Sequence, residues 1–155
     1  MSEYQMRLDL DTAAPGAEDA VSALDTWVAR RRFDRAVLEL VRLRASQING
    51  CQYCLLMHAR DARAAGVPQR KLDVLAAWRE AAGFSAKERA ALAWTEAVTL
   101  VSQGQVPDAV YQAVRPELSD EELATVTMAI VAVNTWNRLS ISLRMQATGD
   151  LAVVA

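Results

Sequence analysis

The residues best suited to chemistry in this chain are two cysteines and one histidine that lie close together in the sequence. Cys51 and Cys54 are the only cysteines, and His58 is the only histidine. On a helix, residues three or four positions apart lie on the same face, so these three side chains would be neighbours. The spacing therefore predicts one reactive site, where the two sulfurs can close a small disulfide.

A cysteine at the start of a helix is chemically activated. Asn49-Gly50 interrupts a helical pattern, and both residue types tolerate turns, so we expect a helix of about fifteen residues from near Cys51 to Gly66. Unpaired N–H groups and the positive end of the helix dipole would stabilise a thiolate there. A thiolate can attack a peroxide oxygen, and the sulfenic acid that forms condenses with a second thiol to a disulfide.

Proton transfer needs a further group, and two residues are candidates. His58 belongs to the side-chain type that titrates near neutral pH, and it lies on the cysteine face. Glu39 lies on the preceding helical segment. Two antiparallel helices joined at Asn49-Gly50 would bring its carboxylate back over the cysteine turn.

A metal site is the alternative interpretation of the same residues. Cys51, Cys54 and His58 could supply three ligands, with water or Glu39 as the fourth. No other cysteine or histidine exists to close a structural zinc site. We therefore expect neither a metal nor another cofactor.

The rest of the chain reads as helical, with no segment that alternates with period two as a strand would. Ser85 to Glu88 and Ser119 to Glu122 each fit a capping box at the start of a helix. Pro107 to Val114 fits a short helix. The sequence predicts a single all-α domain of about six or seven helices.

The chain is expected to divide into three parts. These are an N-terminal segment over 1–14, partly extended, the domain over 15–148, and a C-terminal tail over 149–155.

The composition is that of an ordinary globular protein. Of 155 residues, 52% are hydrophobic and 23% are charged, and the net charge is -2. A pI of about 5.4 argues against a nucleic-acid surface, because such surfaces usually carry a basic excess. The start of the chain lacks the apolar region of a secretory signal. The longest uncharged run, 123–137, is shorter than the roughly 20 residues that cross a bilayer. We expect a cytoplasmic protein that binds neither nucleic acid nor membrane.

The stretch from Glu39 to His58 also resembles a known family. Its Glu, Leu-Arg-x-Ser, Asn-Gly-Cys-x-x-Cys and His are all in register with the core signature of the AhpD-like alkylhydroperoxidases, within the carboxymuconolactone decarboxylase family. Trp136-Asn137-Arg138-Leu139 is similar to a segment near the C-terminus of that family. The best-known peroxidase members carry a histidine between the cysteines, where this chain has Tyr53.

The resemblance implies an AhpD-like fold that assembles as a homo-oligomer, a trimer or hexamer. It implies a cofactor-free, antioxidant peroxidase that reduces organic hydroperoxides, with Cys54 as the peroxidatic cysteine and Cys51 as the resolving one. Glu39 and His58 would form the proton relay. An external dithiol, in the family sometimes a lipoyl-bearing protein, would supply the electrons.

Three residues take supporting places around this expected site. We expect Ser46 and Asn49 to hold the turn before the cysteine helix. Tyr53 either offers its hydroxyl to the site or packs.

Two other functions fit the cysteine pair. One is general thiol–disulfide exchange, in which peroxides are incidental. The other is a redox-responsive binding module whose contacts change when the disulfide forms. Peroxide turnover separates the leading hypothesis from both.

Overall fold

The computed structural model describes residues 5–148, and within that range the chain forms helices and no strand. The predicted all-α class is confirmed. In chain order the elements are α1 Leu10–Ala13, α2 Ala17–Ala29, α3 Arg35–Asn49, α4 Gln52–Ala64, α5 Gln69–Asp73, the 3-10 helix η1 Leu75–Ala77, α6 Ala86–Thr99, α7 Val101–Gly104, α8 Asp108–Val114 and α9 Asp120–Leu143. The α-helices in the described range exceed the predicted number because α1, α5 and α7 are single short turns.

The helix boundaries follow the capping signals of the sequence. Ser85 and Ser119 both complete the predicted capping boxes, at the starts of α6 and α9. In each box the serine accepts from a backbone N–H that would otherwise lack a partner, and a glutamate three residues later accepts from the serine N–H. Helix α9 runs for 24 residues, beyond the uncharged stretch that the sequence marks as buried.

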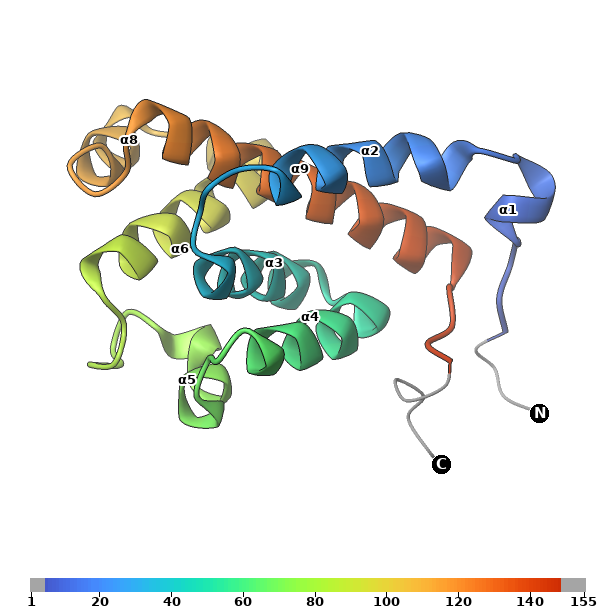
Figure 1. Ribbon diagram of the computed structural model, residues 1–155, viewed down its shortest axis with the longest axis horizontal. Coiled ribbons are helices and arrows are strands. Elements are labelled where there is room, and N and C mark those ends of the chain that lie inside the picture. Colours follow the sequence, from blue (N-terminus) through green and yellow to red (C-terminus); the bar gives the residue numbers. More distant parts are fainter. Residues whose placement is uncertain (1–4, 149–155) are drawn as a thin grey trace.

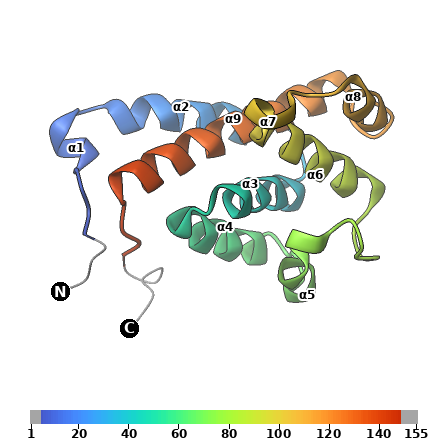
Figure 2. The ribbon, with the colours of Figure 1, turned by 180° about the vertical axis from the view of Figure 1, so that it is seen from behind.

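Helix α3 lies at the centre of the fold, where it packs against α4, α6 and α9. Figure 1 shows α2 and α9 side by side along one edge of the molecule, with α3 and α4 forming a second pair beneath them. The view from behind shows the same two pairs (Figure 2). Buried side chains of α3 contribute to apolar clusters on two sides, represented by Val37 and Val41 on one and by Leu40 and Leu43 on the other. The helix that carries Glu39 is thus fixed on several sides.

Several expectations concern the ends and surface of the chain. The 1–14 segment contains the short helix α1, and Arg7 donates its backbone N–H to the Leu143 carbonyl at 2.8 Å, which ties this segment to the end of α9. The 149–155 tail lies outside the described residues, and the domain limits stay a prediction. Within residues 5–148 no helix is both long and apolar enough to cross a membrane. The homo-oligomer stays a prediction.

Candidate active site

The two cysteines lie at the start of α4, joined to each other. Cys51 is the N-cap residue, and its sulfur accepts a hydrogen bond from the Cys54 backbone N–H at 3.3 Å. A disulfide connects the two residues, whose Cα atoms are 5.4 Å apart. Each cysteine is only 1% exposed. The predicted position at a helix N-terminus is therefore observed, and it places the sulfurs at the positive end of the helix dipole.

The turn that delivers Cys51 to this position depends on Gly50. Gly50 ends α3 with φ +70, in the left-handed region that favours glycine. The Cys51 N–H donates to the Ser46 carbonyl at 3.1 Å, and the Gly50 N–H donates to the Gln47 carbonyl at 3.3 Å. The chain reverses within two residues, so α4 packs back along α3.

Ser46 and Asn49 connect the end of α3 to α9. The Asn49 side-chain amide donates to the Asn137 side chain at 2.8 Å. Asn137 in turn donates to the Ser46 hydroxyl at 3.1 Å, and that hydroxyl donates to the Arg42 carbonyl at 2.8 Å. Ser46 and Asn137 are fully buried. Both residues that the sequence assigns to this turn thus belong to one polar chain that ties the turn to α9.

Glu39 and His58 meet across the α3–α4 pair. The His58 Nδ1 lies 2.9 Å from a Glu39 carboxylate oxygen, and the two residues are 7% and 3% exposed. The antiparallel arrangement predicted from the Asn49-Gly50 turn brings them together. The structure therefore joins a buried base to a buried carboxylate one helical turn beyond Cys54.

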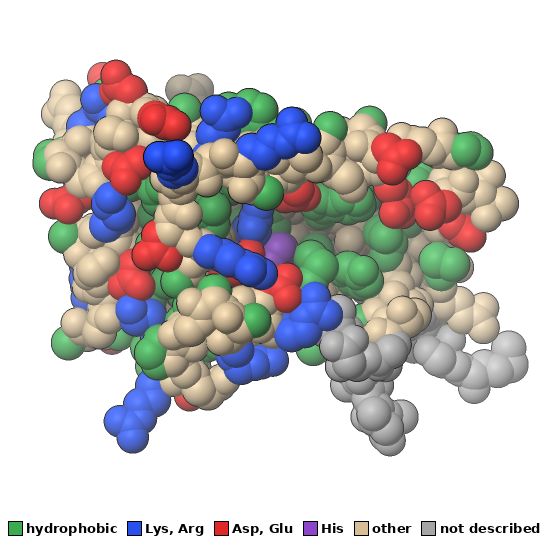
Figure 3. Space-filling model, viewed as in Figure 1, with side chains coloured by type: hydrophobic (Ala, Val, Ile, Leu, Met, Phe, Trp, Pro, Cys, Tyr) green, Lys and Arg blue, Asp and Glu red, His purple; other side chains and the backbone are tan. Residues whose placement is uncertain are grey.

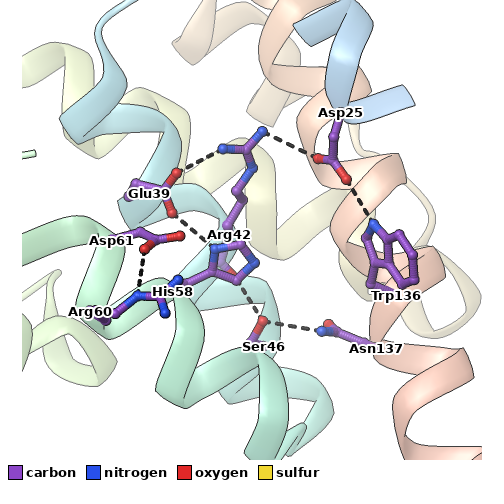
Figure 4. Close-up of polar contacts among 9 residues, drawn as sticks. All are labelled: Asp25, Glu39, Arg42, Ser46, His58, Arg60, Asp61, Trp136 and Asn137. Atoms are coloured by element: carbon purple, nitrogen blue, oxygen red, sulfur yellow. Dashed lines mark hydrogen bonds and ion pairs between the residues drawn. The ribbon is translucent and has the colours of Figure 1, made fainter. Parts of the chain in front are cut away.

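The Glu39 carboxylate has a second partner, which extends the network to α2 and α9. Arg42 donates to Glu39 at 2.8 Å and to Asp25 at 3.3 Å. Trp136 donates its indole N–H to the other Asp25 oxygen at 2.7 Å. Figure 4 shows this chain running from His58 through Glu39, Arg42 and Asp25 to the indole.

The network keeps Glu39 ionised. Burial raises the pKa of the Glu39 carboxyl, but the hydrogen bond and charge of His58 and the charge of Arg42 together outweigh it. The pKa of Glu39 is therefore held below its ordinary value. An ionised Glu39 can orient the His58 ring and stabilise its protonated form.

Two pockets flank this part of α4. The histidine pocket, of about 480 Å³, is lined by residues that include Glu39, Arg42, His58 and Asp61. Figure 3 shows the histidine at the bottom of a hollow whose rim carries basic side chains. The cysteine pocket, of about 130 Å³, is lined by Glu18, Tyr53, Cys54, Met57, Trp136, Ser140 and Met145.

The predicted site residues divide between these pockets. Glu39 and His58 line the histidine pocket, whereas Cys54 and Tyr53 line the cysteine pocket. The Cys54 sulfur lies 3.8 Å from the Ser140 hydroxyl, at hydrogen-bonding distance for sulfur. Cys51 is joined to Cys54 and lines neither of these two pockets. The site residues thus border two neighbouring pockets, although Cys54 and His58 are one helical turn apart.

The residues that could hold a metal differ from the set suggested by the sequence. Cys51 and Cys54 are joined to each other and in that state cannot act as thiolate ligands. Donor atoms of Glu39, His58 and Asp61 lie within 4.8 Å of one another. However, Arg42 already places a fixed positive charge on Glu39, which disfavours a cation at the same carboxylate.

Sequence reasoning missed several residues of this neighbourhood, among them Asp25, Arg42 and Ser140, and it noted Trp136 only as part of a family-like segment. Arg42 had a signal, because a charge of opposite sign three positions after Glu39 lies on the same helix face. Asp25 and Ser140 are brought in by α2 and α9, and their contacts depend on tertiary packing.

Comparisons with known proteins support the family relationship that the stretch from Glu39 to His58 predicts. Residues 15–97 match the model of the Carboxymuconolactone decarboxylase family. The uncharacterized protein YdfG of Bacillus subtilis is 34% identical over 134 residues, which cover 86% of this chain and 91% of that protein.

Two solved structures are similar as well. A protein of unknown function from Agrobacterium tumefaciens, described as a candidate antioxidant defence protein AhpD, is 36% identical with a TM-score of 0.89, over 94% of this chain and all of that one. The debrominase Bmp8 shares 18% identity with a TM-score of 0.79, over 90% of this chain and 75% of that one. The second likeness shows the fold alone.

Proposed function

Because the chain belongs to the carboxymuconolactone decarboxylase family and has an AhpD-like fold, we propose that it is a thiol-dependent peroxidase that reduces organic hydroperoxides. The observation that carries the proposal is the Cys51–Cys54 disulfide at the start of α4, with His58 one turn further along the same helix and paired with Glu39 of α3. One fold can host several reactions, so the function is argued from these groups.

In the proposed cycle Cys54 is the nucleophile. Its thiolate attacks one oxygen of the hydroperoxide, the O–O bond breaks, and the sulfur becomes a sulfenic acid while the other oxygen leaves as an alkoxide and takes a proton to become an alcohol. The positive end of α4 supports the thiolate. Cys54 is also the cysteine whose side chain lines a pocket, which supports its choice over Cys51.

Cys51 completes the chemistry on the protein. Its thiolate attacks the Cys54 sulfur, the S–O bond breaks, and hydroxide leaves and is protonated to water. The two electrons that reduce the peroxide thus come from the two thiols. An external dithiol then attacks the disulfide, passes through a mixed disulfide and leaves as its own disulfide. A lipoyl-bearing protein is the candidate donor by family resemblance.

Glu39 and His58 are proposed to handle the protons. His58 takes the Cys54 thiol proton, and returns a proton to the leaving alkoxide, through a water at the boundary of its pocket and the cysteine pocket, where Met57 and Trp136 line both. Glu39, ionised and fixed by Arg42, orients the imidazole ring and stabilises its charged form. Ser46 and Asn49 fix the turn that sets the distance between α3 and α4.

General thiol–disulfide exchange is the second candidate, and the burial of the sulfurs counts against it. At 1% exposure, neither cysteine presents its sulfur to a large protein disulfide without rearrangement. A small oxidant needs less access, and so does a small dithiol such as dihydrolipoamide. A wild-type protein that reduces a small aromatic disulfide faster than it reduces tert-butyl hydroperoxide would favour exchange.

Steady-state turnover tests the proposal. With dihydrolipoamide as reductant, the wild-type protein should consume tert-butyl hydroperoxide catalytically, and Cys54→Ser should consume none. Ser142→Ala, in an exposed serine near the end of α9, is the control and should match the wild type. Peroxide consumption by Cys54→Ser at the wild-type rate would show that the roles are wrongly assigned.

A further inference from the structure

Cys54 and His58 open onto different pockets, although only one helical turn of α4 separates them. Cys54 lines the cysteine pocket, and His58 lines the histidine pocket. In the described part of the chain, Met57 and Trp136 line both pockets and so lie at the boundary between them. The cysteine pocket is thus a route toward the buried Cys54 sulfur that does not pass through the histidine pocket.

We propose that hydroperoxides reach Cys54 through the cysteine pocket, and that this pocket selects small, uncharged hydroperoxides. The inference rests on the proposed peroxidase function and names the substrate class for the same site. The volume of the pocket, its lining and the charge on its wall support it.

The volume limits the bulk of the substrate close to the peroxide group. Sites that enclose a drug-sized ligand usually measure about 300–1,000 Å³. The cysteine pocket, at about 130 Å³, is well below that range. It has room for a peroxide group and a short alkyl group, and a bulky aromatic group next to the peroxide would have to displace Met57 or Met145.

The lining suits an alkyl hydroperoxide. Met57, Trp136 and Met145 give the pocket an apolar wall, on which an alkyl group can pack. Ser140, 5% exposed, supplies a hydroxyl group beside the sulfur. This hydroxyl lies 3.8 Å from the Cys54 sulfur and 3.6 Å from the Met145 sulfur. It can donate a hydrogen bond to a thiolate or to a peroxide oxygen held against it.

Acidic residues set the charge on the pocket wall. Glu18 of α2 lines the pocket and is half-buried. Burial, followed by the negative charges of Asp11, Asp9 and Asp19, raises the pKa of the Glu18 carboxyl, so three further carboxylates lie near enough to act on this wall. Figure 3 shows acidic side chains gathered over α1 and the start of α2. An anionic hydroperoxide that approaches Cys54 past these residues is repelled, whereas a neutral one is not.

The histidine pocket differs in size and lining. It is larger, about 480 Å³, and three arginines line it together with three carboxylates, namely Arg31, Arg35, Arg42, Asp25, Glu39 and Asp61. Such a pocket would suit a larger, polar molecule, but Cys54 is not part of its lining. Entry by this side is therefore the competing outcome of the test.

Two substitutions on α2 block one pocket each. Glu18→Trp fills the cysteine pocket from its wall, and Ala29→Trp does the same at an exposed position of the histidine pocket. In single-turnover experiments with pre-reduced protein and tert-butyl hydroperoxide, Glu18→Trp should lower the second-order rate constant about tenfold or more, and Ala29→Trp should change it less than about twofold. Glu18→Gln controls for the lost charge. The reverse pattern would place the entrance at the histidine pocket and overturn the inference.

Alkylation of Cys54 tests access without any peroxidase activity. In a Cys51→Ser background, iodoacetamide and iodoacetate differ in charge at almost equal size. The neutral reagent should react faster, and Glu18→Gln should raise the iodoacetate rate relative to iodoacetamide by about threefold to tenfold. Equal ratios in the two proteins would refute the charge selection.

The size limit is tested with two hydroperoxides. The rate for cumene hydroperoxide relative to tert-butyl hydroperoxide should rise when Met145→Ala widens the pocket, and an unchanged ratio would refute the limit.

Failure of the proposed function can be told apart from failure of the inference. If pre-reduced wild-type protein reacts with peroxide no faster than a free thiol, the proposed function fails. The alkylation result still decides whether the cysteine pocket is the entrance.

Discussion

Two carboxylates of this protein, Glu39 and Glu96, are held in similar ways in two different regions. Glu39 accepts a hydrogen bond from Arg42 of α3 at 2.8 Å, and Glu96 accepts one from Arg44 of the same helix at 2.9 Å. Burial raises the pKa of each carboxyl. In each case the hydrogen bonds and charges of the partners outweigh burial, so that the pKa of both carboxyls is lowered.

The difference lies in the remaining partners. Glu39 bonds to His58, whose imidazole ring can both accept and donate a proton. Glu96 bonds to the Trp78 indole N–H at 2.8 Å and to Arg79, neither of which releases a proton under ordinary conditions. Glu96 therefore connects α3 and α6 to the segment directly after η1, as a structural ion network. A lowered carboxyl pKa therefore does not by itself identify a functional site. The chemistry of the groups bonded to the carboxylate does.

Glu39→Gln should give the largest effect on function. The amide keeps the size of the side chain but cannot stabilise a charged imidazole, so turnover of tert-butyl hydroperoxide should fall by about 10²–10⁴-fold. Circular dichroism should show an unchanged helical content. Wild-type turnover in this variant would remove the proposed distinction between the two carboxylates.

Glu96→Gln is the matched change in the other region. It leaves Arg44 and Arg79 without their anionic partner, and the free energy of unfolding should fall by about 1–3 kcal/mol. Turnover by the folded protein should stay within about twofold of the wild type, because no reacting group is nearby. Urea unfolding and the peroxide assay measure the two quantities, and a loss of turnover comparable to that of Glu39→Gln would break the comparison.

Acid pH should affect both regions in the same direction. The pKa of each carboxyl is lower in the folded protein than its ordinary value of about 4.5. The stability that each ion network contributes is therefore fully present above that value and is lost as the pH falls through the lower folded pKa. The difference in unfolding free energy between the wild type and each glutamine variant should shrink as urea titrations move from neutral pH to below about pH 4. A difference that grows in acid would contradict the direction of both pKa shifts.

The smallest effects should come from the tryptophans that end the two networks. Trp136→Phe removes the hydrogen bond to Asp25, and Trp78→Phe removes the one to Glu96. Each should lower the free energy of unfolding by about 1–2 kcal/mol, from the lost hydrogen bond and the smaller ring. Only Trp136→Phe should also slow peroxide turnover, because its ring separates the two pockets of the site. An equal slowing by Trp78→Phe would indicate that general loosening of the fold controls the rate.

The sequence predicted much of the fold because its signals are local. The capping boxes at Ser85 and Ser119 and the Asn49-Gly50 turn depend on residues within a few positions of one another, and each is found where expected. The turn also explains why Glu39 and His58 could be paired from the sequence. A four-residue helix such as α1 or α7 leaves too little periodicity to be predicted.

The rest of the site could not be predicted, because it depends on distant parts of the chain. Asp25 and Ser140 reach the site through the packing of α2 and α9 against α3 and α4. The same packing separates the site into two pockets. The spacing of Cys54 and His58 puts them on one face of α4, and nothing in it indicates that they line different pockets.

The central claim is that Cys54 attacks the peroxide and Cys51 resolves it. It is tested most directly by intact-mass analysis of pre-reduced protein after one equivalent of tert-butyl hydroperoxide. We expect the wild type to lose the two thiol hydrogens and to regain them with dihydrolipoamide, Cys51→Ser to gain one oxygen atom, and Cys54→Ser to stay unchanged. Oxidation of Cys54→Ser at the wild-type rate, with Cys51→Ser unchanged, would contradict it.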